Sequence, residues 1–338
     1  MYSQEGISSA YGPARLQEVM RTVKTLEGVG KSSLKPGHDL RYTDLSGTVH
    51  GWTNLTRVKL EGAVLKSCDL TGSLLPKMDG LDMRGAKIAL TGFAVDHDED
   101  GGYAIDRASY VGTNLEGAYA FGGNFSLTDF SGANLTGVDF SWADVSRAAF
   151  ERANVCGAKF DYAFIGWERS GKPKGLEEAL DLNHVSFLHT QMSSGNFREK
   201  NFSECNFTGA NLEGSTFDRC NFENCTLLGA QLTNCAFRGG SAEKTAFSWD
   251  NLHSARFTDT NLKGAKFVGH PEKLRHERAG EAPKFTKTNL EGADFRHLDL
   301  TDVDFTGSNL EGANFDGARI ICANMKGARL VNASFKRA

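Results

Sequence analysis

A five-residue phrase recurs through most of the chain and limits its possible folds more than any other feature. The phrase consists of a small residue, Asn or Asp, a large apolar residue and two polar or small residues, as in residues 133–145. On an α-helix five residues turn by about 500°, so the large residues would spread over every face. On a flat strand an odd period would point them to alternate sides. The pattern therefore predicts a chain that bends once per repeat, which the recurring Gly, Ser, Asn and Asp favour.

Such a chain winds into a solenoid that encloses its large residues and stacks its coils through backbone hydrogen bonds. The phrases at residues 113–117 (Thr-Asn-Leu-Glu-Gly) and 210–214 (Ala-Asn-Leu-Glu-Gly) resemble the pentapeptide-repeat family, over about residues 38–338. The resemblance implies an all-β fold, a right-handed quadrilateral β-helix with four pentapeptides per coil. Counting the large residues then predicts about thirteen coils.

Composition excludes several classes of protein. The chain has 338 residues and a formal net charge of −4, which gives no overall signal for nucleic acid or membrane surfaces. No apolar run approaches the ~20 residues of a membrane span, and the N-terminus lacks the basic and apolar regions of a signal peptide. The seven Cys form no CxxC pair. We therefore expect a reduced, cytoplasmic setting, although a specialised secretion signal would escape this reasoning.

The phrase is interrupted at a few places, which define the expected domain organisation. Residues 1–37 form a tail with an amphipathic helix at 14–27, which would cap the open end of the solenoid or serve as a dimerisation or partner helix. Residues 38–338 form a single repeat domain. Its phase slips by two residues at Pro76, and insertions stand near 96–107, 166–184 and 268–283. The count predicts that the first two leave from the same corner three coils apart. A change in the phase of the aromatic–aliphatic alternation indicates that the third consumes one face.

Steps of twenty residues should place side chains in columns inside the solenoid. Phe197, Phe217, Phe237 and Phe257 form one such column, and Met192, Leu212, Leu232 and Leu252 form its neighbour. His50 occupies one of the apolar slots and is interpreted as a core or edge residue. Cys205, Cys220, Cys225 and Cys235 stand two residues before a large residue, a slot that takes small side chains throughout. They are interpreted as packed thiols; the alternative is a strained bridge or a metal pair between stacked Cys205 and Cys225.

One stretch suggests a metal. Asp96, Asp98, Asp100 and Gly101 match the first half of a calcium loop, but Arg107 stands where an EF-hand needs a bidentate Glu. The alternative is a solvated acidic loop. No other cofactor is indicated. The sequence contains no Ser/His/Asp or Cys/His arrangement and no phosphate-binding Gly-rich motif, and a filled lumen leaves no natural pocket. The chain is therefore predicted not to be an enzyme.

Binding residues are predicted where the repeat carries an outward Trp or is interrupted by a charged loop. Trp142 and Trp249 follow positions next to a large residue and should point outward, where exposed Trp often marks an interface. Trp167 and the charged loop residues Asp98, Glu99, Arg169 and Lys172 are the further candidates for partner binding. The alternative is that these Trp side chains only shield corners.

Three functions fit these features. The first is a protein-interaction scaffold with specific loops, for which a homodimer through a terminal helix or coil end is one arrangement. The second follows from the resemblance, because quinolone-resistance members are described as mimicking duplex DNA and binding gyrase. A mimic needs acidic faces, yet residues 110–165 hold only six acidic residues against three basic ones. The third is a bacterial effector delivered into host cells. Direct nucleic-acid binding is not expected.

Overall fold

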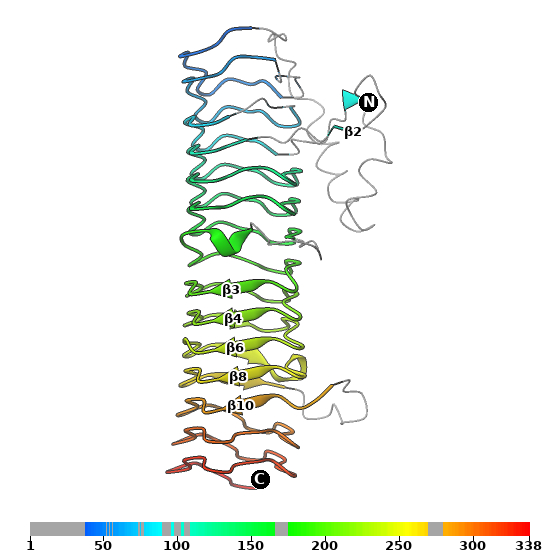
Figure 1. Cartoon of the computed structure of the whole chain (residues 1–338), viewed down its shortest axis with the longest axis vertical. Coiled ribbons are helices and arrows are strands. Elements are labelled where there is room, and N and C mark those ends of the chain that lie inside the picture. Colours follow the sequence, from blue (N-terminus) through cyan, green and yellow to red (C-terminus); the bar gives the residue numbers. More distant parts are fainter. Residues whose placement is uncertain are drawn as a thin grey trace. The chain divides into compact units, whose positions relative to one another are not determined.

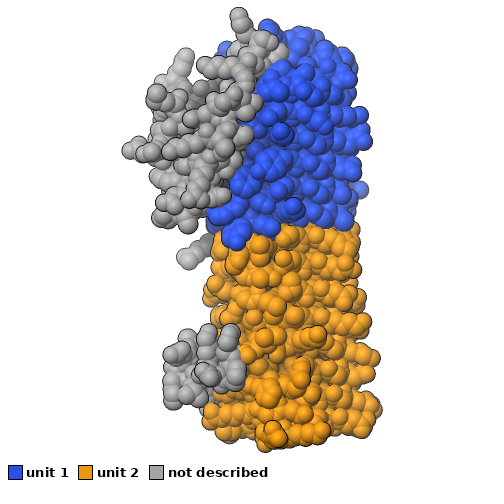
Figure 2. Space-filling view, turned by 180° about the vertical axis from the view of Figure 1, so that it is seen from behind, with its two compact units in different colours: residues 1–180 blue, residues 181–338 orange. Residues whose placement is uncertain are grey.

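The structure is a computed structural model that describes residues 38–51, 53, 55, 57–73, 75, 78–89, 96–97, 103–104, 109–165, 175–269 and 280–338. The chain divides into two compact units, residues 1–180 and 181–338 (Figure 2). The helix expected at residues 14–27 lies outside the described residues. Within the described part of the chain, no helix is long and apolar enough to cross a membrane.

Each pentapeptide makes one hydrogen-bonded turn. In the repeat around Phe140, the Phe140 carbonyl accepts the Ala143 N–H at 2.9 Å, and Trp142 has a φ of 64°. The left-handed conformation explains why Gly is frequent at this third position of the turn. Asp139 Oδ1 accepts the Ser141 N–H at 2.9 Å. This local bond is one that only a short acceptor side chain can make, so it explains the Asn or Asp of the repeat.

The turns stack into coils through parallel β-bridges between residues twenty positions apart. In the first unit Asn114 pairs with Asn134, and Asn134 pairs with Asn154. In the second unit Asn289 pairs with Asn309 in the same way. Four repeats of five residues thus complete one coil, and each coil contributes four large side chains to the lumen. The predicted fold class, an all-β parallel solenoid of pentapeptides, is confirmed.

Regular strands occur mainly in the second unit, where one face of each coil straightens. The five-stranded parallel sheet has the order β10-β8-β6-β4-β3 (Figure 1). A three-stranded parallel sheet, β5-β7-β9, forms on another face. Their bounds are Asn196–Arg198 (β3), Thr216–Asp218 (β4), Thr226–Leu227 (β5), Ala236–Arg238 (β6), Ala246–Ser248 (β7), Arg256–Thr258 (β8), Lys266–Val268 (β9) and Lys284–Thr286 (β10).

The core consists of columns of large side chains that run from coil to coil. Phe197 pairs in register with Phe217, Phe217 with Phe237, and Phe237 with Phe257, as the twenty-residue steps predict. Successive rings stack with centroids 4.7–5.5 Å apart. Each fully buried Phe contributes roughly 1.5–3 kcal/mol from transfer alone, so these columns are the main source of stability.

The interruptions change the register without breaking the stack. Around the predicted slip, Asp82 pairs with Val64, only eighteen residues away. Asp82 also pairs with Asn114, thirty-two residues away, so the first insertion adds the twelve residues expected at 96–107. Within that insertion β1 (Asp96–His97) pairs antiparallel with β2 (Tyr103–Ala104). The slip and the insertion therefore lie where the phase of the pattern predicts them.

The second insertion is shorter than predicted. A 3₁₀ turn, η1 (Leu176–Glu178), follows Gly175 and buries Leu176, and Ala179 and Leu182 are buried too. The Glu178 carbonyl accepts the Arg152 N–H at 3.1 Å, and Leu180 N–H donates to the Ala153 carbonyl at 2.8 Å. Residues 175–184 therefore belong to the stack of coils, and the insertion boundary at 184 was wrong. The sequence misleads here because a 3₁₀ turn replaces one pentapeptide and breaks its spacing.

The two insertions of the first unit return to the same face. The corner from which the first insertion leaves is outside the described residues, so the common corner of departure stays a prediction. The Met78 N–H donates to the carbonyl of Ser109, which lies just after the first insertion. In a later coil the N–H at the same position, that of Phe130, donates to the carbonyl of Ala149. On that same face, the Arg152 N–H donates to the Glu178 carbonyl of η1, which follows the second insertion. Three coils, beginning at Tyr110, Phe130 and Phe150, separate the two returns.

Candidate interaction surfaces

Five aromatic side chains gather on the outside of the first unit, over three consecutive coils. We call Tyr119, Phe121, Trp142, Tyr162 and Phe164 the aromatic patch. Tyr119, Tyr162 and Phe164 are 38–40% exposed, whereas Phe121 and Trp142 are half-buried. Large apolar side chains at such exposure are unusual as a group on an idle surface. The patch includes Trp142, which the sequence singled out as an outward residue.

The repeat geometry brings these rings into contact. The rings of Trp142 and Tyr162 occupy the third turn position of successive coils and stack with centroids 4.8 Å apart and an interplanar angle of 13°. The rings of Tyr119 and Phe121, two residues apart along one coil, stack at 5.8 Å and 6°. The backbone fixes the first pair, because the Trp142 N–H donates to the Asp161 carbonyl at 2.8 Å. The rings are thus preorganised rather than loosely attached.

A carboxylate accompanies each exposed ring. Tyr119 pairs across adjacent coils with Asp139, and Phe164 pairs in the same way with Asp144. Tyr162 directly follows Asp161 in the chain. The pKa of Tyr119 is raised, first by its burial and then by the Asp139 charge. The patch therefore alternates aromatic rings with negative charge.

Trp249 contradicts the prediction that it points outward. It begins a second 3₁₀ turn, η2 (Trp249–Asn251), and is only 2% exposed. Its ring stacks on Phe285 at 6.3 Å and meets the ring edges of Phe267 and Phe295. A pentapeptide would have directed this third position outward; η2 instead turns it into the core. Trp249 is therefore a packing residue and is withdrawn as a partner-binding residue.

The third insertion explains why the core has room for that indole. Across it, Lys284 of β10 pairs with Arg256 of β8, so the coil contains twenty-eight residues instead of twenty. The position that continues the column of Leu232 and Leu252 is Gly280, since the Ser254 N–H donates to the Glu281 carbonyl, and the column of large side chains resumes at Leu300. The insertion thus takes the place of one face, as predicted, and the Trp249 ring packs at that level.

A cavity of about 300 Å³ lies next to this indole. Glu281, one of its acidic residues, pairs with Lys284 at 3.0 Å, and Asp299 Oδ1 accepts the Thr301 N–H at 3.0 Å. In the described part of the chain no three His, Cys, Asp or Glu side chains are placed to hold a metal ion. The lining consists of Trp249, His253, Gly280, Glu281, Ala282, Pro283, Asp299, Thr301, Asp302 and Val303.

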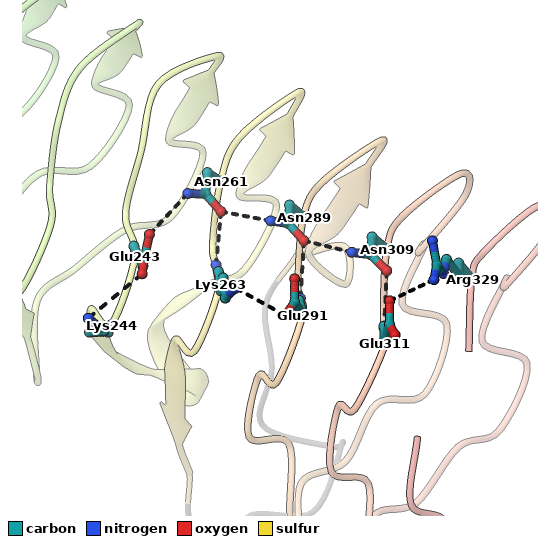
Figure 3. Close-up of polar contacts among 9 residues, drawn as sticks. All are labelled: Glu243, Lys244, Asn261, Lys263, Asn289, Glu291, Asn309, Glu311 and Arg329. Carbon is teal, nitrogen blue, oxygen red and sulfur yellow. Dashed lines mark hydrogen bonds and ion pairs between the residues drawn. The ribbon is translucent and has the colours of Figure 1, made fainter. Parts of the chain in front are cut away.

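Another face of the second unit carries a polar ladder (Figure 3). Asn289 Nδ2 donates to Asn261 Oδ1, and Asn309 Nδ2 donates to Asn289 Oδ1, both at 3.0 Å. Beside this amide row the charges are mutually compensated. Lys263 pairs with Glu291 at 3.0 Å, Arg329 with Glu311 at 2.9 Å, and Lys244 with Glu243 at 3.8 Å. Such pairs do not amount to a negative stripe.

The predicted packed thiols are confirmed. All seven Cys are free, and Cys68, Cys205, Cys220, Cys225 and Cys235 are buried. Cys225 Sγ donates to the Phe202 carbonyl at 2.8 Å, in the slot where Thr245 Oγ1 donates to Phe222. Burial raises the pKa of Cys225 to about 12, so its nucleophilic thiolate is scarce. These thiols therefore suit packing, not catalysis.

Most of the loop residues predicted to bind a partner or metal lie outside the described residues: Trp167, Asp98, Glu99, Asp100, Arg169 and Lys172. For Asp96 only the backbone, in β1, is described. Four members of the aromatic patch were missed in the sequence. Their signal was present, because Tyr162 follows Trp142 by twenty residues and Phe164 and Tyr119 replace the usual Asn or Asp.

Comparison with known proteins identifies the repeat. The sequence model described as pentapeptide repeats matches residues 39–74, 106–137, 113–152, 201–239, 283–309 and 299–337, more than half of the chain. A search of curated proteins found no match.

Similar solved structures include pentapeptide-repeat proteins. HetL of the cyanobacterium Nostoc sp. strain PCC 7120, involved in heterocyst differentiation regulation, is 17% identical, with 94% of this chain and 96% of HetL covered and a TM-score of 0.19. A QnrB1 variant, a plasmid-mediated fluoroquinolone resistance protein, is 16% identical over 72% of this chain and 90% of its own, with a TM-score of 0.25. Rfr23 of the cyanobacterium Cyanothece 51142 is 15% identical over 74% and 95%, with a TM-score of 0.18. With TM-scores of 0.18–0.25, these structures add nothing to the family that the repeat model indicates.

Proposed function

The chain belongs to the pentapeptide-repeat family, and on that premise we propose that it is a non-enzymatic scaffold that binds another protein through the aromatic patch. The observation that carries the proposal is the group of exposed rings at Tyr119, Tyr162 and Phe164 over three consecutive coils. Aromatic side chains held rigid before binding lose little conformational entropy in a complex and commonly dominate its energy.

The internal chemistry of the repeat supports a binding role over a catalytic one. The lumen is filled by stacked rings such as those of Phe130 and Phe150, which lie 5.4 Å apart. Burial raises the pKa of the Cys68, Cys220, Cys225 and Cys235 thiols. The carboxylates of the repeat accept backbone N–H groups of their own turns, as Asp129 does from Ser131 at 2.9 Å. These groups serve the fold. The outer surface is therefore the part of the molecule that a partner can contact.

Gyrase binding by DNA mimicry is the alternative that family resemblance suggests. Two observations weigh against it. The glutamates of the polar ladder are paired with Lys263, Arg329 and Lys244. In the first unit Asp82 is likewise paired, with Arg84 at 2.8 Å and Lys66 at 3.2 Å. A surface that imitates the phosphate backbone requires uncompensated negative charge over successive coils.

The proposal is tested by affinity capture with a triple variant, Tyr119→Ser, Tyr162→Ser and Phe164→Ser. Each change removes an exposed ring, so the fold should persist. Tyr42→Ser is the matched control, because Tyr42 is an 83% exposed ring elsewhere in the same unit. We expect a protein that the wild-type chain and the control retain and the triple variant loses. Equal capture by all three would contradict the proposal. Recovery of gyrase together with inhibition of supercoiling would favour the alternative.

A further inference from the structure

The charges around the aromatic patch narrow the chemistry of its partner. Each exposed ring stands one residue or one coil away from a carboxylate: Tyr119 with Asp139, Tyr162 with Asp161, and Phe164 with Asp144. The coil spacing of neighbouring strands is about 4.8 Å, so ring and carboxylate can contact one bound group together. Tyr119 and Asp139, like Phe164 and Asp144, are neighbours across adjacent coils, whereas Tyr162 and Asp161 are neighbours along one coil.

We propose that the patch recognises an arginine-bearing segment of the partner protein; this inference rests on the proposed function. A guanidinium group is planar, stacks on an aromatic ring and pairs with a carboxylate through two parallel N–H donors. Lysine offers a compact charge that lacks the planar fork. The Tyr119–Asp139 pair is the principal arginine site, and the Tyr162–Asp161 pair on the following coil fits a second arginine of the same segment.

The carboxylates are positioned for this by the repeat itself. Asp139 Oδ1 accepts the Ser141 N–H and Asp144 Oδ1 accepts the Ser146 N–H, both at 2.9 Å. These bonds fix the orientation of each side chain. The half-buried Asp139 has further lone pairs for an external donor, whereas Asp144 is only 9% exposed and serves its own turn. Residues 110–165 also carry six acidic residues against three basic ones, so the whole block attracts a cationic segment. Two exposed bases repel a cation here and should disfavour charge without stacking: Lys159 beside Asp139, and Lys87, which pairs with Tyr119 from the preceding coil.

The test compares three labelled synthetic peptides that differ only at one residue type: alternating arginine and glycine, lysine and glycine, and citrulline and glycine. Fluorescence anisotropy with the full chain gives Kd for each. We expect the arginine peptide to bind about tenfold more tightly than the lysine peptide, which is the effect of roughly one good stacking contact. The neutral citrulline peptide should bind more weakly than either.

Two variants decide where such a preference originates. Tyr119→Ser with Asp139→Asn removes one ring–carboxylate pair, and Asn is a residue that the repeat accepts at that position. Glu213→Gln removes one exposed charge in the second unit as a matched control. The double variant should lose most of the preference for arginine, and the control should keep it.

Equal Kd values for arginine and lysine peptides, or a preference that survives in the double variant, would overturn the inference. This failure is distinguishable from failure of the proposed function. If capture of the partner still depends on Tyr119, Tyr162 and Phe164 while no arginine preference exists, the scaffold proposal stands and only the partner chemistry is wrong.

Discussion

The indole Nε1 of Trp249 donates a hydrogen bond to the backbone carbonyl of Asp299 at 3.1 Å, fifty residues further along the chain. In regular coils the equivalent carbonyl accepts a backbone N–H from the preceding coil, as Asn251 does from Leu232 and Asp294 does from Phe267. At the third insertion the indole N–H of Trp249 thus replaces the backbone N–H that donates to the corresponding carbonyl in regular coils. The interruption is bridged by packing and hydrogen bonding from an earlier coil.

Replacing Trp249 should therefore destabilise the second unit. Trp249→Ala should lower the free energy of unfolding by about 3–5 kcal/mol, because it leaves a large cavity among Phe267, Phe285 and Phe295. Trp249→Phe keeps a ring but lacks the donor to Asp299, and should cost about 1–3 kcal/mol. Denaturant titration of the three proteins measures the difference. A decrease of less than about 0.5 kcal/mol in the free energy of unfolding for Trp249→Ala would show that Trp249 does not stabilise the core.

At the third turn position, the way the His297 ring lies makes glycine necessary one coil later. The His297 ring lies so close to Gly317 that a Cβ there would be 2.6 Å from its Nδ1, while a Cβ on Gly312 would meet nothing within 4 Å. Both glycines have a positive φ, +69° and +66°. Gly312→Ala should thus cost only the conformational penalty of about 1–2 kcal/mol, and Gly317→Ala should cost about 1–2 kcal/mol more.

A double-mutant cycle, followed by thermal or denaturant unfolding, tests whether the His297 ring causes the additional loss of stability in Gly317→Ala. In a His297→Ala background the two glycine substitutions should become equally destabilising, because the clashing ring is gone. If Gly317→Ala remained the worse of the two in that background, the cause would lie in the backbone and not in the His297 ring.

His50 makes stability depend on pH. It occupies an apolar slot at 9% exposure, and burial lowers its pKa from the ordinary value of 6.5. The unfolded chain then binds more protons than the folded chain between the lowered pKa and 6.5, so stability falls as pH falls through that window. His50→Leu should abolish this part of the acid sensitivity. Denaturation midpoints at pH 7.5 and 5.5 for both proteins measure it; parallel shifts in both would refute the assignment to His50.

The cysteines should react in two classes. Cys322 is exposed, whereas burial raises the pKa of Cys68, Cys225 and Cys235 to about 12. At neutral pH a thiol reagent should therefore modify Cys322 first and the three buried thiols only on unfolding, as followed by peptide mass spectrometry. Rapid labelling of Cys225 in the native protein would contradict the packing described for its slot.

Much of the fold could be predicted because the pentapeptide joins three requirements in one phrase. The large residue fills the lumen, the Asn or Asp accepts its own turn's N–H, and the third turn residue tolerates a positive φ. These are local rules, so the column of Phe197 to Phe257, the slip at Pro76 and the first insertion could all be located from spacing.

The errors occur where a local rule is replaced by a 3₁₀ turn. At Leu176–Glu178 and Trp249–Asn251 the spacing of the phrase is broken, and the sequence gives no indication of which side chain then turns inward. Trp249 was misplaced for that reason. The aromatic patch was only partly found, because Tyr119 and Phe164 stand at positions where Asn or Asp is expected. These rings form one patch only once it is known which coils are neighbours.

Photo-cross-linking tests the central claim, that the aromatic patch is the partner-binding surface, most directly. Benzoylphenylalanine placed singly at positions 119, 162 and 164 retains an aromatic side chain at each exposed site, and position 42 serves as the exposed aromatic control. The account predicts that one protein from the lysate is cross-linked from the three patch positions and not from position 42. Cross-linking to that protein from position 42 alone, or equally from all four positions, would contradict it.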